Sequence, residues 1–286
     1  MEIKTVFIAG AGSMGSGIAQ VTAQASYAVL LEDISEAFVQ KGLASISASL
    51  DRFIKKGTMT AETKAQILAR IRPVTNLSAA KEADLVIEAI PENMALKVAF
   101  FREVDGICPA HTFLASNTSS MPISAMAAAT KRPAQVMGMH FMIPAPVIKG
   151  VEIIRTKYTS DDTFAAGRAF IQSLGKEPCE AADYAGFIVT RILDAMMNEA
   201  IRCAMDGNRP EEIDKAMRVC CNMPLGPLEL ADLSGNDIVL HGLETLEEEF
   251  GERFHAAALL KSMVRSGDFG RKAGRGFYKY EKPALK

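Results

Sequence analysis

Short apolar runs alternate with amphipathic stretches from the start of the chain to about residue 180. A short apolar run predicts a buried strand, whereas apolar residues three or four positions apart predict a helix. The alternation predicts a mostly parallel, doubly wound α/β sheet. Strands are expected over 4–9, 28–31, 85–90, 112–116, 135–140, 151–155 and 177–181, and helices over 35–56, 94–104 and 160–174, from Thr60 and after Pro122.

A pair of helices is expected as an insertion after the second strand. The first of them ends at Lys55-Lys56-Gly57, where basic residues precede a glycine that stops the helix. Thr60 opens the second, and Ile67, Leu68 and Ile71 form its apolar side. The insertion is therefore predicted to be entirely helical.

The pattern becomes purely helical from residue 187, with helices expected over 187–205, 210–219, 228–250 and 256–266. The change lies near Asp183-Tyr184-Ala185-Gly186. We therefore expect an α/β domain over residues 1–183 and an all-α domain over residues 184–286. A helical domain of about 100 residues does not easily cover all of its own apolar faces. Homodimerisation through this domain is the expected consequence.

The first predicted strand runs into Gly10-Ala11-Gly12-Ser13-Met14-Gly15, which fits the pattern G-x-G-x-x-G. A helix with small packing residues and a second strand follow, which is the context that this dinucleotide-binding motif requires. Gly10 permits the tight turn, Gly12 lets the backbone approach a pyrophosphate, and Gly15 lets helix and strand pack closely. The helix N-terminus then offers N–H groups to the phosphates. The sequence predicts a Rossmann-like domain that binds a dinucleotide.

An acidic residue follows the second strand. Asp33 stands about 20 residues after the glycine motif, where a carboxylate binds the adenosine ribose hydroxyls. The same charge repels a 2′-phosphate, and Ile34-Ser35 offers no arginine to hold one. The predicted cofactor is therefore NAD and not NADP.

Composition narrows the class of protein. The 286 residues are 49% hydrophobic and 23% charged with a net charge of −2, so no basic field indicates nucleic-acid binding. No apolar run reaches the length of a membrane helix, and the first one ends in the glycine motif and is no signal peptide. The five cysteines, Cys220-Cys221 among them, show no metal-binding spacing. We expect a cytoplasmic protein with reduced thiols and no metal.

His140 ends a predicted strand and is followed by an irregular segment. In an open α/β sheet the carboxyl ends of the strands face the ligand crevice. Glu152 begins the next predicted strand, and a glutamate beside the imidazole orients it and stabilises its charged form. The pair is equally consistent with a histidine bonded to backbone and a glutamate at a solvated strand end.

Polar residues also follow the strand over 112–116. The amides and hydroxyls of Asn117-Thr118-Ser119-Ser120 are suited to hold a nicotinamide ribose or a substrate oxygen. An ordinary polar turn before the helix after Pro122 has the same composition.

Further motifs occur in order along nearly the whole chain. They are Gly17-Ile18-Ala19-Gln20, Val86-Ile87-Glu88-Ala89, Glu92-Asn93, Ser116-Asn117-Thr118-Ser119-Ser120, Met139-His140-Phe141, Pro144-Ala145-Pro146, Gly186-Phe187, Arg191, Asn198-Glu199-Ala200, Gly226-Pro227, Gly270-Arg271-Lys272 and Gly276-Phe277-Tyr278. Together with the glycine motif they resemble the L-3-hydroxyacyl-CoA dehydrogenase family, in the form most like bacterial 3-hydroxybutyryl-CoA dehydrogenases.

The resemblance implies hydride exchange between NAD and the C3 carbon of a 3-hydroxyacyl or 3-ketoacyl thioester of coenzyme A. It implies that His140 is the general acid/base on the C3 oxygen and that Glu152 orients it. Ser119 is implied to bind the substrate oxygen and the nicotinamide side. The remaining implied contacts are Glu92, Lys97 and Lys272 for the cofactor, and Ser49 and Lys56 for coenzyme A. Asn117 is also expected at the cofactor, from its place after the strand over 112–116. Without the resemblance, Ser49 and these lysines are typical of a solvated surface.

Two positions depart from the family pattern. Ile143 and Thr190 stand where the family usually has asparagines, one near the nicotinamide ribose and one on the substrate, and Gly150 replaces a common apolar residue. Loss of one neutral hydrogen bond costs about 0.5–1.5 kcal/mol, so we expect a weakened and not an abolished activity. The alternatives are a dehydrogenase of free 3-hydroxy acids on the same scaffold, and a non-catalytic NAD-binding relative.

Overall fold

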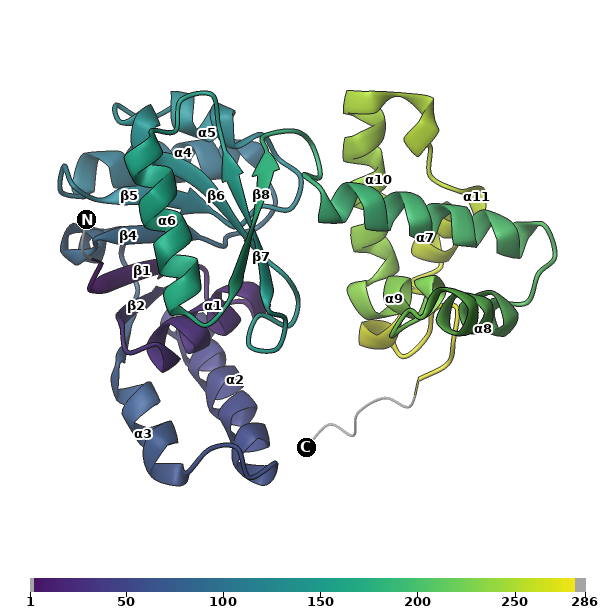
Figure 1. Cartoon of the computed structure of the whole chain (residues 1–286), viewed down its shortest axis with the longest axis horizontal. Coiled ribbons are helices and arrows are strands. Elements are labelled where there is room, and N and C mark those ends of the chain that lie inside the picture. The colour runs from purple at the N-terminus through teal and green to yellow at the C-terminus, as the bar shows by residue number, and fades with distance from the viewer. Residues whose placement is uncertain (1–2, 281–286) are drawn as a thin grey trace. The chain divides into compact units, whose positions relative to one another are not determined.

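The computed structural model describes residues 3–280. The chain divides into two compact units, one ending at Asp183 and one beginning at Tyr184 (Figure 1).

The first unit is built on one eight-stranded sheet with the order β3-β2-β1-β4-β5-β6-β7-β8. All neighbouring strands are parallel except β6 and β7, which are antiparallel. The prediction of a doubly wound, mostly parallel sheet is confirmed. The strands are β1 Thr5–Ala9, β2 Ala28–Glu32, β3 Ile71–Val74, β4 Leu85–Glu88, β5 Phe113–Ser116, β6 Val136–Phe141, β7 Gly150–Arg155 and β8 Glu177–Ala182.

Helices cover both faces of the sheet (Figure 1). Alternate strand residues such as Val6, Ile8 and Met139 form one core with apolar residues of α1, α2, α3 and α6. The helices α4 and α5 lie on the other face, where α5 contacts β6. The bounds are α1 Ser13–Gln24, α2 Glu36–Lys55, α3 Ala61–Ala69, α4 Met94–Ile107, α5 Ile123–Ala128 and α6 Asp161–Ser173, with short 3₁₀ turns at Leu77–Glu82 and Pro133–Gln135.

Local sequence signals account for several helix starts. The side chains of Ser35, Thr60, Asn93 and Ser160 each accept a hydrogen bond from a backbone N–H in the first turn of the helix that follows. Such caps satisfy backbone donors that have no partner within the helix.

Ile71 was expected on the apolar side of a helix, and this expectation is wrong. The helix α3 ends at Ala69, and Ile71 begins β3, which pairs with β2 through Val29. The helical insertion therefore leads into an edge strand. The spacing of Ile71 after Ile67 and Leu68 fits a helix, but an apolar residue at this position fits the start of a strand equally well.

Between residues 184 and 280 the second unit is helical, apart from isolated β-bridges of Arg275 with Gly270 and Lys279. The helices are α7 Val189–Met205, α8 Pro210–Cys221, α9 Pro227–Ser234, α10 Asn236–Phe250 and α11 Ala258–Arg265, with 3₁₀ turns at Glu252–Phe254 and Arg271–Ala273. The single helix expected over 228–250 is broken at Gly235, whose φ of 105° is incompatible with a helix. Within residues 3–280, no helix has the length and apolarity that a membrane crossing requires.

Candidate active site

The glycine turn lies between β1 and α1. Gly10 has a φ of 96°, and a Cβ atom there would collide with the carbonyl of Ala89 on the neighbouring strand. A Cβ atom at Gly15 would collide with the carbonyl oxygen of Gly10. By contrast, a Cβ atom of Gly12 would meet no heavy atom of residues 3–280 within 4 Å, apart from its neighbours along the chain. The turn is therefore closed on its inner side and open at Gly12, as a bound pyrophosphate requires.

Asp33 is tied to the glycine turn. Its Oδ2 accepts a hydrogen bond of 2.8 Å from the N–H of Ala11, and its Oδ1 accepts one of 2.8 Å from Ile34. The neighbouring Glu32 is buried at the end of β2, and its pKa is raised to about 7 by burial and then by the charges of Asp33 and Glu103. The acidic end of β2 thus holds two carboxyl groups, of which sequence reasoning selected Asp33 alone.

His140 and Glu152 are brought together by the antiparallel pairing of β6 and β7. The two residues stand directly opposite each other in the register, and His140 Nδ1 lies 2.8 Å from Glu152 Oε2. Both side chains are buried. An imidazole held through Nδ1 by a carboxylate has a fixed ring orientation and a fixed tautomer, with Nε2 as the basic nitrogen.

The segment after β5 approaches the end of β6. Asn117 Oδ1 accepts a hydrogen bond of 2.8 Å from the N–H of Phe141, the residue after His140. Two residues further on, Ser119 is half-buried, and its N–H donates to Glu92 Oε1 at 3.1 Å. The segment that carries Ser119 is therefore fixed from both sides.

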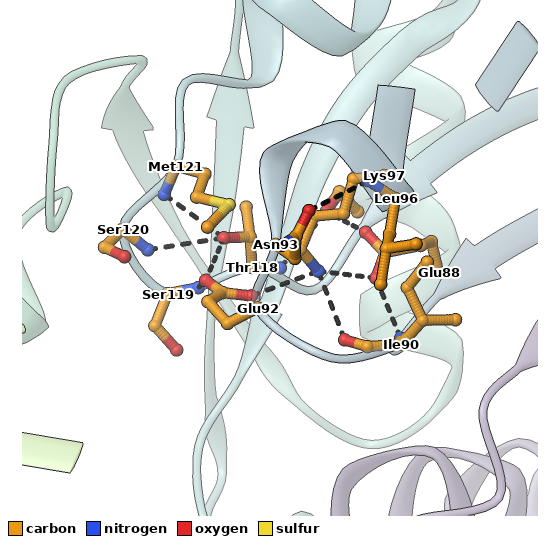
Figure 2. Close-up of polar contacts among 11 residues, drawn as sticks. Glu88, Ile90, Glu92, Asn93, Leu96, Lys97, Thr118, Ser119, Ser120 and Met121 are labelled. Atoms are coloured by element: carbon orange, nitrogen blue, oxygen red, sulfur yellow. Dashed lines mark hydrogen bonds and ion pairs between the residues drawn. The ribbon is translucent and has the colours of Figure 1, made fainter. Parts of the chain in front are cut away.

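A buried ion-pair network supports this segment, and Figure 2 shows Lys97 at its centre. The Lys97 ammonium, with 1% of the side chain exposed, lies 2.6 Å from Glu88 Oε1 and 3.0 Å from Glu92 Oε2 and donates to the carbonyl of Ile90. Glu92 in turn accepts a hydrogen bond from the Thr118 hydroxyl. Lys97 thus connects α4 and β4 with the Ser119 segment through Glu92.

Charges in the network shift the pKa values of its carboxyl groups. Burial raises the pKa of Glu88, opposed by Lys97 and by hydrogen bonds from Ser116 and the N–H of Ile90. Burial also acts on Glu92, but Lys97 and the hydrogen bonds from Thr118 and Ser119 outweigh it and hold its pKa below the ordinary value. Glu92 therefore carries a negative charge at neutral pH.

The remaining predicted site residues are not part of this cluster. Ser49 is buried on α2, and Lys56 is exposed at the end of that helix. Thr190 and Lys272 belong to the second unit, where Thr190 lies in the first turn of α7 and Lys272 forms an ion pair of 2.6 Å with Asp237. Their roles stay predictions.

Sequence reasoning missed three supporting residues. Glu88 was noted only within a motif, although its carboxylate holds Lys97. Asp183 accepts hydrogen bonds from the N–H groups of Ile123 and Ser124 and thereby caps α5. The Lys176 ammonium donates to two carbonyl groups of the segment after β6. No local pattern predicts the role of Asp183 or of Lys176, because their partners lie about 60 and about 30 residues earlier in the chain.

The donor groups of the first unit fit a dinucleotide. The N-terminus of α1 has no acidic residue in its first turn and no side-chain cap, so its N–H groups suit an anion. Gly12 leaves room for close approach, and Asp33 supplies the carboxylate that a ribose diol requires. Within residues 3–280, no group of three His, Cys, Asp or Glu side chains is placed to hold a metal ion.

A parallel sheet with a dinucleotide turn and a buried His–Glu pair defines a nicotinamide-dependent oxidoreductase. Residues 5–184 match the family model described as 3-hydroxyacyl-CoA dehydrogenase, NAD binding domain. Residues 186–280 match the C-terminal domain of the same family. The chain therefore belongs to the 3-hydroxyacyl-CoA dehydrogenase family, and its cofactor is NAD. The resemblance found in the sequence is confirmed.

Individual relatives support this assignment along the full chain. The chain is 45% identical over 283 residues to a probable 3-hydroxybutyryl-CoA dehydrogenase of Bacillus subtilis, covering 98% of this chain and 99% of that one. The structure of (S)-3-hydroxybutyryl-CoA dehydrogenase PaaH1 from Ralstonia eutropha is 47% identical with a TM-score of 0.93, covering 98% of this chain and all of that one. FadB2 of M. tuberculosis matches at 38% identity and a TM-score of 0.96, with 98% and 100% coverage.

Proposed function

We propose that this protein is an NAD-dependent dehydrogenase that interconverts short-chain L-3-hydroxyacyl-CoA, such as 3-hydroxybutyryl-CoA, and the matching 3-ketoacyl-CoA. The observation that carries the proposal is the buried His140–Glu152 pair beside the segment of Ser119. Relatives named 3-hydroxybutyryl-CoA dehydrogenase, at 42–45% identity over nearly the whole chain, support the substrate class.

His140 is proposed as the general acid/base. In the direction of oxidation, Nε2 takes the proton of the C3 hydroxyl while the C3–H bond breaks. The bound nicotinamide supplies the acceptor for the hydride. Glu152 accepts the Nδ1–H hydrogen bond and stabilises the imidazolium that forms. In the reverse direction, the imidazolium returns the proton to the carbonyl oxygen of the 3-ketoacyl group.

Ser119 is proposed to donate a hydrogen bond to the C3 oxygen and to contact the nicotinamide side. Its placement by Glu92 and Asn117 supports this role, because a donor held in advance loses little freedom on binding. Thr190 and Lys272, on the second unit, are proposed to contact substrate and cofactor respectively. Ser49 and Lys56 are proposed to contact coenzyme A, where an ammonium pairs with a phosphate.

The proposal also covers where the protein works and how it assembles. We infer that the enzyme works in the cytoplasm and forms a homodimer through the helical unit. Exposed apolar side chains there, such as Val219 and Ile238, are consistent with a partner surface. Sedimentation of the purified protein at several concentrations tests the dimer.

Turnover of acetoacetyl-CoA with NADH, followed at 340 nm, tests the activity. We expect wild type to be active and His140→Gln to lose about 10²- to 10⁴-fold in kcat, the usual contribution of a general acid/base. Activity on free 3-hydroxybutyrate alone would instead support a dehydrogenase of free acids. NADH binding without turnover on any 3-ketoacyl-CoA would support the non-catalytic alternative.

The coenzyme A contact has its own test. Lys56→Ala is expected to raise KM for acetoacetyl-CoA with little change in kcat, because the phosphate contact lies away from the reacting carbon. Lys41→Ala, on an exposed position of the same helix, is the matched control. An unchanged KM in Lys56→Ala would contradict the contact.

A further inference from the structure

The segment 142–149 joins β6 to β7 and begins two residues after His140. Several of its apolar side chains are exposed, with 59% of Ile143 and 64% of Val147 accessible. Its internal hydrogen bonds are few: the N–H groups of Val147 and Ile148 both donate to the carbonyl of Pro144. The conformation of such a segment depends on contacts from elsewhere in the fold.

Lys176 supplies the strongest of these contacts. Its Nζ donates to the carbonyl oxygen of Ala145 at 2.6 Å and to that of Ile148 at 2.6 Å. The residue precedes β8, and the N–H of the following Glu177 donates to the carbonyl of Lys149 at 2.9 Å. One end of β8 thus holds three carbonyl groups of the segment 142–149.

A buried ammonium is costly when no carboxylate accompanies it. Lys176 is 9% exposed, and none of residues 3–280 provides a carboxylate to it. Burial accordingly lowers its pKa. The side-chain hydrogen bonds that offset this cost are those to the carbonyls of Ala145 and Ile148 in the segment 142–149.

The segment also packs against the cofactor helix. Ala145 is buried, and a Cβ atom built on Gly17 of α1 would lie 3.1 Å from the Cβ of Ala145 and 3.4 Å from the Cδ of Pro146. Gly17 lies two residues after Gly15, the last residue of the glycine motif, so the segment rests on the first turns of the helix that receives the pyrophosphate. The absence of a side chain at Gly17 allows this close approach.

We propose that Lys176 is a positioning residue for cofactor binding. By holding the carbonyls of Ala145 and Ile148, it keeps the segment 142–149 seated on α1. This contact keeps a constant distance between the end of β6, which carries His140, and the N-terminus of α1. Loss of the ammonium releases the segment from α1 and weakens NAD binding, while the strand register leaves the His140–Glu152 pair in place.

Lys176→Met is the direct test, because methionine keeps most of the length of the side chain without its donors. We expect the Kd for NADH, measured by the cofactor's fluorescence, to rise about tenfold or more. Hydrogen exchange of the Val147 and Ile148 amides should become faster. Lys176→Arg retains donors and should recover part of the affinity. Lys149→Met, an exposed lysine of the same segment, is the matched control and should bind as wild type.

Gly17→Ala tests the contact from the other side. Alanine favours the helix over glycine by about 1 kcal/mol, which offsets the steric cost of the added Cβ, so the thermal midpoint should change little. The added Cβ presses on Ala145, and the Kd for NADH should rise as in Lys176→Met. This variant keeps the proposal testable even where Lys176→Met folds poorly.

The kinetic arm, which alone rests on the proposed function, separates positioning from general damage. KM for NADH should rise in both variants while kcat and its pH profile stay within about twofold. An unchanged Kd for NADH in well-folded Lys176→Met, or equal losses in Lys149→Met, would overturn the proposal. Because NADH binding and hydrogen exchange need no substrate, these outcomes do not depend on turnover.

Discussion

His140 Nδ1 and Glu152 Oε2 lie 2.8 Å apart, on directly paired residues of two antiparallel strands. Both groups therefore come from regular secondary structure and not from loops. Backbone hydrogen bonds of the ladder fix their separation, which limits the reorganisation that proton transfer requires.

Glu152→Gln is expected to lower kcat by about 10²-fold or more while KM for NADH stays near that of wild type. A glutamine holds the imidazole without stabilising its charged form, and its amide can present a donor to Nδ1 and reverse the tautomer. Steady-state rates on acetoacetyl-CoA measure the effect. Glu177→Gln, an exposed glutamate at the start of β8, should retain full activity. A change in KM alone would contradict the orienting role.

Lys97→Met is expected to destabilise the first unit by about 3–5 kcal/mol, because it leaves the buried Glu88 and its neighbour Glu92 without their shared cation. Urea unfolding followed by circular dichroism measures this loss. Arg72→Met breaks the exposed ion pair with Glu82 and should cost about 1 kcal/mol or less. Similar losses of unfolding free energy in the two variants would show that the buried network stabilises the first unit no more than an exposed ion pair does.

Asp33→Asn should weaken the discrimination between NADH and NADPH by about tenfold, equivalent to about 1.4 kcal/mol. Asparagine removes the charge that repels a 2′-phosphate and keeps one acceptor for the N–H of Ala11 or Ile34. The ratio of kcat/KM for the two cofactors is the measurement. Glu36→Gln, in the first turn of α2, controls for net charge nearby. An unaltered ratio would mean that another group sets the preference.

Asp194 makes the stability of the helical unit depend on pH. Burial raises its pKa from 3.8 to about 7, and none of residues 3–280 pairs with its carboxyl. The folded state therefore holds a proton that the unfolded chain releases, so this contribution is complete below about pH 4 and is lost as pH rises through 7.

Asp194→Asn, which cannot ionise, should gain stability relative to wild type as the pH is raised from 4 to 8. The gain is at most about 4 kcal/mol. Thermal midpoints across this range are the measurement, with Glu199→Gln on the exposed side of α7 as control. A constant difference between Asp194→Asn and wild type at all pH values would refute the shifted pKa.

Thr190→Asn introduces the residue that the resemblance found in the sequence leads us to expect at this position. We expect kcat/KM for acetoacetyl-CoA to rise by up to about tenfold, since a neutral hydrogen bond contributes about 0.5–1.5 kcal/mol. Thr190→Val, which has no donor, should be slower than wild type. An asparagine variant slower than wild type would indicate that this chain is adapted to a different acyl group.

Most of the fold followed from periodicity, because buried parallel strands give nearly continuous apolar runs. The strand β3 was missed because Ile71-Arg72-Pro73-Val74 is only four residues long, has two exposed residues and pairs with β2 alone. The break at Gly235 was missed because apolar spacing continues from α9 into α10 across it. Neither the strand β3 nor the break at Gly235 changes the spacing of apolar residues, which was the basis of the prediction.

Residues of the candidate site were predictable where a polar or glycine residue stands at the end of a predicted strand. His140, Glu152 and the glycine turn were found in this way, and the structure brings the first two together. Lys97 was expected to contact the cofactor, yet its donors are directed at Glu88, Glu92 and a carbonyl. A lysine in a helix pattern gives no sign of which carboxylates the fold will bury beside it.

The antiparallel pairing of β6 and β7 limits which changes of chain length the His140–Glu152 pair can tolerate. His140 and Glu152 meet only in one register, and a slip of one residue would place Val151 or Ile153 opposite the imidazole. An insertion or deletion within either strand would therefore separate the two groups, whereas a change of length between residues 142 and 149 would leave this pairing intact. Such a change would instead disturb the contacts of Ala145 with Lys176 and with Gly17 of α1.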